Sequence, residues 1–74
     1  MNEQQNVNSS LIQQIGYNPL NEQLSVVLRN TPETTYTFRG VSRATANGLI
    51  EAGSKGQYFN RNIRGRFPTT KTIQ

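Results

Sequence analysis

The chain contains no cysteine and no histidine, and only four of its 74 residues are acidic. Without cysteine, neither a disulfide nor a thiolate metal site can form, which fits the reducing cytoplasm. The four glutamates are scattered, so no two are spaced for general acid and base catalysis, and no histidine can act as the base. We therefore expect a protein that is not an enzyme, that needs no cofactor and that binds no metal.

Long apolar segments are absent as well. No run of apolar residues approaches the ~20 that a membrane-spanning helix requires. The N-terminus is polar and acidic, whereas a signal peptide is basic and then apolar. These features predict a cytoplasmic protein with no membrane partner. Its length corresponds to one domain near the lower limit for independent folding, because a chain of this size buries only about 60% of its unfolded surface.

Neither end of the chain has the apolar spacing that would dock it onto a core. Residues 1–8 are rich in asparagine and glutamine, and residues 69–74 lack apolar side chains at regular spacing. We expect a disordered N-terminal tail over 1–8, a single domain over 9–68 and a disordered C-terminal tail over 69–74.

Period-two alternation predicts three strands in the first half of the domain. In the first, Leu11, Ile15 and Tyr17 share one side and Ile12 is expected on the other. In the second, residues 23–29, apolar side chains alternate with polar ones, and in the third, residues 34–39, two aromatics alternate with threonines. Turn-forming Asn-Pro and Thr-Pro sequences separate the three segments. Strands joined by such short turns predict an antiparallel meander.

Two short helices are predicted after the strands. Ser42 can cap a helix over residues 43–52, which Gly53 ends and in which Gly48 indicates close approach of a neighbouring element. In the second, which Ser54 can cap and Gly65 can end, Phe59 and Ile63 are spaced to face the core. The predicted fold is therefore α+β: a three-stranded antiparallel β-meander followed by two short α-helices packed on one face.

Charge is distributed unevenly along the chain. Residues 1–51 hold three arginines and four glutamates, for a net charge of −1, whereas residues 52–74 hold five cations and no acid, for a net charge of +5. Such a segment is typical of a face that binds a polyanion. The alternative is a solvated basic surface that keeps a small protein soluble.

The stretch Ser54–Pro68 contains the pattern S-K-G-x-Y-F-N-x-x-I-x-G. This pattern resembles the signature of the KTSC domain. Ser9–Ser10, Ile15–Tyr17 and Phe38–Val41 fit the same pattern, so the resemblance extends over about Ser9–Pro68. This small domain is named for its occurrence at the C-terminus of some lysyl-tRNA synthetases, and it also occurs as a free-standing protein. The resemblance implies RNA binding, through the link to a tRNA-handling enzyme, and no synthetase catalytic domain is present here.

The candidate nucleic-acid-binding residues come from the basic segment and from one corner of the sheet. A guanidinium group fits a phosphate better than an ammonium group does, so arginines lead the set. An aromatic ring beside arginines can also stack on an unpaired base, although such a ring can equally pack within the domain. The candidates are Arg61, Arg64, Arg66, Lys55, Tyr58, Arg43 and Arg39.

The sequence leaves two functions open. The first is a small non-catalytic binding module for RNA or another single-stranded nucleic acid, in which arginines contact phosphates. The second is a protein-interaction module, a free-standing regulator or inhibitor that docks on a larger cellular or host enzyme. In the second case the basic segment would meet an acidic groove.

Overall fold

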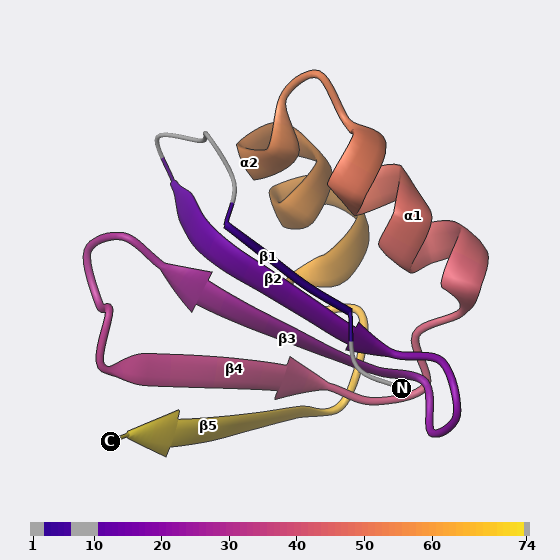
Figure 1. Cartoon of the computed structure of the whole chain (residues 1–74), viewed down its shortest axis with the longest axis horizontal. Coiled ribbons are helices and arrows are strands. Elements are labelled where there is room, and N and C mark those ends of the chain that lie inside the picture. Colours follow the sequence, from indigo (N-terminus) through magenta and orange to yellow (C-terminus); the bar gives the residue numbers. More distant parts are fainter. Residues whose placement is uncertain (1–2, 7–10, 74) are drawn as a thin grey trace.

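The computed structural model describes residues 3–6 and 11–73, which form an antiparallel sheet with a helical layer on one face (Figure 1). Within these residues the strands are β1 (Glu3–Asn6), β2 (Ile12–Asn18), β3 (Gln23–Leu28), β4 (Thr34–Phe38) and β5 (Thr69–Ile73), paired in the order β1-β2-β3-β4-β5. The helical layer consists of α1 (Arg43–Glu51), α2 (Lys55–Tyr58) and a π-helical turn, η1 (Phe59–Ile63). The α+β class and the central meander of β2, β3 and β4 are confirmed.

The prediction of a disordered C-terminal tail is wrong, because Thr69–Ile73 form strand β5 along the free edge of β4. All five side chains of β5 are exposed, so no apolar spacing marks it as a strand. Its three threonines and one isoleucine are β-branched and favour extended backbone. The backbone groups along the edge of β4 supply hydrogen-bonding partners. Gln74 lies outside the described residues.

The N-terminal prediction is also partly overturned. Glu3–Asn6 form β1, which pairs antiparallel with β2, from Glu3 opposite Tyr17 to Asn6 opposite Gln14. Backbone pairing along the edge of β2 needs no apolar side chain, which is why a search for apolar spacing misses this strand. The remainder of the predicted tail, residues 1–2 and 7–8, lies outside the described residues, as do Ser9 and Ser10.

Strand β2 departs from simple alternation. Ile15 and Tyr17 are buried as expected, but Ile12 is buried as well, although the alternation places it on the opposite side. The pairing of β2 with β3 shifts register between Ile12 and Gln14. Such an irregularity inserts an extra residue and reverses the facing of the residues before it. Ile12 therefore joins the core.

The core lies between the sheet and the helical layer. Two aromatic rings link the two layers, because Phe38 of β4 meets Phe59 of η1 edge to face, with ring centroids 5.7 Å apart. The buried apolar residues are Ile12, Ile15, Tyr17, Leu24, Val26, Phe38, Val41, Ala46, Leu49, Phe59 and Ile63. Phe59 and Ile63 are core residues, as their spacing predicts.

Two hydrogen bonds attach the start of α1 to the sheet. The hydroxyl of Tyr17, buried on β2, donates to the carbonyl of Val41 at 2.6 Å, and the amide of Val41 donates to the carbonyl of Glu22 at 2.9 Å. Ser42 then caps α1, its hydroxyl accepting a hydrogen bond from the amide of Thr45 at 3.2 Å. These contacts fix the direction in which the chain leaves β4 and enters the helical layer.

Candidate nucleic-acid interface

The basic segment contains an irregular helix. Ser54 occupies the cap position of α2, but its side chain makes no capping hydrogen bond, contrary to the prediction. After one turn the helix widens, and the amide of Arg64 donates to the carbonyl of Phe59 at 2.9 Å, five residues back. The side-chain amide of Asn62 donates to the carbonyl of Tyr58 at 3.3 Å. A π turn of this kind is rare and is found frequently at functional sites.

A tight turn follows the π turn. The amide of Arg66 donates to the carbonyl of Ile63 at 3.0 Å. Arg64 has φ −64° and ψ 123°, and Gly65 has φ 75°. These values define a type II turn, which requires a positive φ at its third residue and so favours glycine there. Gly65 is thus the left-handed residue that the sequence predicts after the helix.

Arg61, Arg64 and Arg66 are all exposed on this π turn and type II turn, which together we call the arginine turn (residues 59–66). The Nε of Arg66 donates to the carbonyl of Arg61 at 3.1 Å, so the side chain of Arg66 lies back over the end of the helical segment. A cation at the carbonyl end of a helix is electrostatically favourable. The terminal nitrogens of a guanidinium group can still bind an anion when its Nε is occupied.

The conformation of the arginine turn can be tested at Gly65. Gly65→Ala should destabilise the domain by about 1–2 kcal/mol, because a Cβ disfavours positive φ although no atom lies within 4 Å of it. Gly53→Ala is the matched control, since Gly53 is equally uncrowded and is not among the glycines with positive φ. It should be neutral or stabilising by up to about 1 kcal/mol. Urea unfolding measures both variants, and an equal effect at the two positions would contradict the turn assignment.

Arg39 lies next to the chain that leaves the arginine turn. Its amide donates to the carbonyl of Pro68 at 3.0 Å, and its side chain is exposed. The end of β4 and the start of β5 lie at the same end of the sheet, where the chain descends from the helical layer (Figure 1). Arg43, the first residue of α1, is also exposed. The structure thus places the backbone of Arg39 against Pro68, two residues after Arg66, and Arg43 follows one short loop further along the chain.

Lys55 and Tyr58, two other predicted site residues, are engaged within the helical layer. The Nζ of Lys55 donates to the carbonyl of Ala52 at 3.1 Å, just after the last residue of α1. Tyr58 is half-buried, and its hydroxyl donates to the carbonyl of Thr45 at 3.0 Å. The Tyr58 ring lies against Gly48, which explains the glycine within α1. Lys55 therefore caps α1, and Tyr58 joins the two helices.

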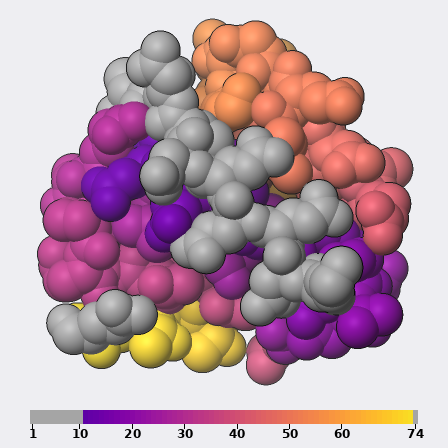
Figure 2. Space-filling model, viewed as in Figure 1, coloured from indigo at the N-terminus to yellow at the C-terminus, as the bar shows by residue number. Residues whose placement is uncertain are grey.

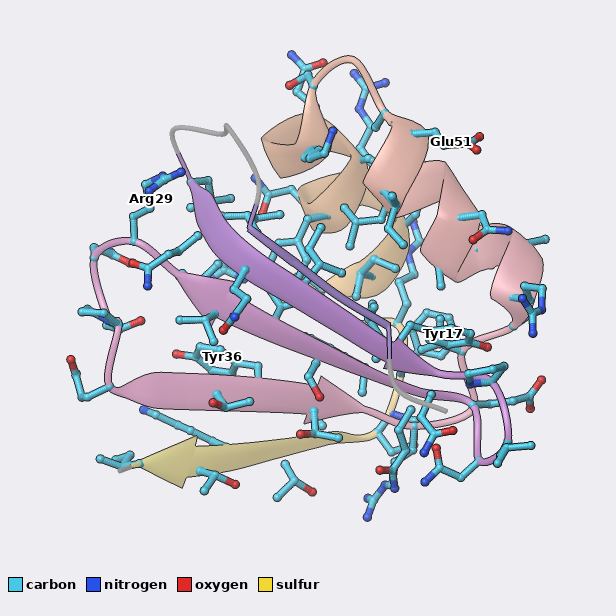
Figure 3. All side chains as sticks on the ribbon, in the orientation of Figure 1. Tyr17, Arg29, Tyr36 and Glu51 are labelled. Atoms are coloured by element: carbon cyan, nitrogen blue, oxygen red, sulfur yellow. The ribbon has the colours of Figure 1, made fainter. Side chains whose placement is uncertain are left out.

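Strand pairing brings together two residues that are not among the candidates predicted from the sequence, Lys71 and Tyr36. Lys71 is exposed on β5, and the register places it opposite Tyr36 of β4, which is half-buried (Figure 3). Their proximity depends on β5 being a strand, so a sequence reading that leaves residues 69–74 disordered cannot find it. The only available signal was the β-branched composition of Thr69–Ile73.

Other classes of site are limited within the described residues. No three side chains of histidine, cysteine, aspartate or glutamate come together in residues 3–6 and 11–73 in a way that could hold a metal ion. Over the same residues, no helix has the length and apolar character needed to cross a membrane.

The architecture defines a small α+β domain in which an antiparallel sheet carries one helical layer and an exposed arginine turn. Residues 8–67 match the KTSC domain, and the chain belongs to that family. Its fold is similar to the crystal structure of the KTSC domain protein YPO2434 from Yersinia pestis. The two share 35% sequence identity and a TM-score of 0.89, over 97% of this chain and 99% of that one. Among curated proteins, none matches this chain.

Proposed function

We propose that this KTSC domain is a small non-catalytic module that binds RNA or another single-stranded nucleic acid through the arginine turn. One observation carries the proposal: Arg61, Arg64 and Arg66 are exposed together on a turn within a segment that contains no acidic residue. Arginine binds phosphate through a planar fork of donors, and phosphate neutralisation supplies much of the affinity of such proteins.

Arg39 extends the proposed interface, because its backbone is bonded to Pro68, two residues after Arg66. Arg43 is a more distant contributor at the start of α1. Lys55 and Tyr58 take lesser parts, since the Lys55 ammonium and the Tyr58 hydroxyl are both held by backbone carbonyls of the helical layer. Binding should thus depend on phosphate contacts and differ little between nucleotide sequences.

The test is the salt dependence of binding to a fluorescently labelled single-stranded RNA, followed by anisotropy. Replacing Arg61, Arg64 and Arg66 with glutamine removes three exposed charges and keeps side-chain hydrogen bonding. Each lost phosphate contact should lower the magnitude of the log–log salt slope by about 0.7, so the triple variant should lose about 2. Its melting curve is recorded alongside, because Arg66 also bonds the carbonyl of Arg61.

Arg29→Gln is the control for loss of charge alone. Arg29 is exposed at the end of β3, at the opposite end of the sheet from the chain that joins η1 to β5 (Figures 1 and 3). This variant should keep the wild-type slope. The proposal would be contradicted if the wild type did not bind RNA at low salt, or if the triple variant kept the wild-type salt slope. If single-stranded RNA competes better than duplex DNA, stacking by Tyr58 becomes part of the interface.

A further inference from the structure

Strand β5 leaves one edge of the sheet open within the described part of the chain. It pairs with β4 on one side, and no described strand lies on its other side. All five of its residues are exposed, and in Figure 2 it forms the lower rim of the molecule (yellow). The outward backbone N–H and C=O groups of such an edge can pair with another extended chain.

The side chains beside this edge have a definite pattern on the helix-bearing face. The register places Lys71 opposite Tyr36 and Ile73 opposite Thr34, and Thr34 and Tyr36 share a face with the buried Phe38. The side chain of Ile73 is 67% exposed, one of two large apolar side chains exposed to this degree among the described residues. A cation and an apolar side chain therefore stand two residues apart on one face of an open strand.

We propose that β5 accepts an extended acidic peptide of a partner protein as an additional strand. An acidic side chain of the added strand would lie opposite Lys71, and an apolar side chain two residues away would lie beside Ile73. Charge complementarity selects this occupant, because residues 52–74 contain no acid and the exposed Arg39 is bonded to Pro68 at the start of β5. Lys71 and Ile73 lie on β5 and not on the arginine turn, so peptide binding and nucleic-acid binding can be tested separately.

A second copy of the chain fits the edge less well. If two β5 strands paired antiparallel with Lys71 at the centre, the two Lys71 side chains would face each other directly. Like charges in directly opposed positions destabilise a strand pair. A lysine in the middle of an edge strand is also a common device against pairing between identical chains. The acidic segment of a different protein meets neither obstacle.

The probe is a short capped peptide in which threonines alternate with one valine and one glutamate, so that both fall on one face. Titration into the isotope-labelled protein should move the amide NMR signals of residues 69–73 and slow their hydrogen exchange. Lys71→Glu should weaken binding about threefold to tenfold, since it replaces an attractive cross-strand pair with a repulsive one. The same variant should prefer a peptide with lysine in place of glutamate.

Arg64→Gln is the matched control, because Arg64 is an exposed cation on the arginine turn and not on β5. It should leave the affinity for the peptide within about twofold of wild type. Three results would overturn the proposal. The first is that the amide NMR signals of residues 69–73 do not move when the peptide is added. The second is an equal loss of affinity in Arg64→Gln and Lys71→Glu. The third is self-association of the wild type through β5 that the peptide does not reverse.

Discussion

Phe59→Ala should destabilise the domain by about 3–5 kcal/mol, a large part of the stability available to a chain of this size. Phe59 is 3% exposed and its ring meets Phe38 edge to face, so truncation leaves a cavity at the contact between η1 and β4. For a domain of this length each kcal/mol corresponds to about 4–8 °C in melting temperature. We therefore expect the variant to melt at least about 12 °C below the wild type, or to be unfolded at room temperature.

Two further variants make this measurement specific. Phe59→Leu keeps an apolar side chain in the cavity and should recover much of the loss. Leu20→Ala removes a side chain that is 84% exposed at the turn between β2 and β3, and should change stability by no more than about 0.5 kcal/mol. If Phe59→Ala melts within a few degrees of the wild type, η1 does not anchor the helical layer on the sheet as described.

The core could be predicted from the sequence where the backbone is regular. Alternation placed Leu24 and Val26 inward on β3, and the four-residue spacing of Phe59 and Ile63 placed both in the core. In each case burial of apolar surface and the period of the element point to the same residues. Ile12 is the exception, because the register shift in β2 reverses its facing and single-residue insertions leave no mark in the apolar pattern.

The two edge strands could not be predicted for a different reason. Strand β5 buries no side chain, and its stability comes from backbone pairing with β4. A search for apolar residues at every second position cannot detect backbone pairing. The pairing of Lys71 with Tyr36 therefore follows from the strand register and not from any sequence pattern. The exposed arginines of the candidate site, by contrast, could be predicted from their charge, because charged side chains are seldom buried.

Hydrogen bonds from side chains to distant backbone carbonyls are a second feature that could not be predicted from the sequence. The basic character of Lys55 predicts a phosphate contact, but in the structure its Nζ donates to the carbonyl of Ala52. The position of Tyr58 beside arginines predicts a base-stacking role, but in the structure its hydroxyl donates to the carbonyl of Thr45. Both bonds depend on the angle between α1 and α2, which no local pattern specifies. Gly48 was the one signal of that contact in the sequence.

Gly48→Ala should destabilise the domain, although alanine favours a helix by about 1 kcal/mol over glycine. A Cβ on Gly48 would overlap the hydroxyl of Tyr58 and lie 2.6 Å from its Cζ, far inside van der Waals contact. The Tyr58 ring must then move, which breaks the hydrogen bond to Thr45 that joins α1 to α2. Overpacking of this kind costs about 1–3 kcal/mol, which we expect to exceed the gain in helix propensity.

The sign of this effect should reverse when the ring is absent. In a Tyr58→Ala background the space beside Gly48 is vacated, so Gly48→Ala should stabilise the variant by up to about 1 kcal/mol through helix propensity. Urea unfolding of the wild type, both single variants and the double variant forms a double-mutant cycle that isolates the contact. A coupling energy near zero would mean that Gly48 and Tyr58 do not touch. A coupling of about 2 kcal/mol or more would establish that this glycine is there to admit the ring.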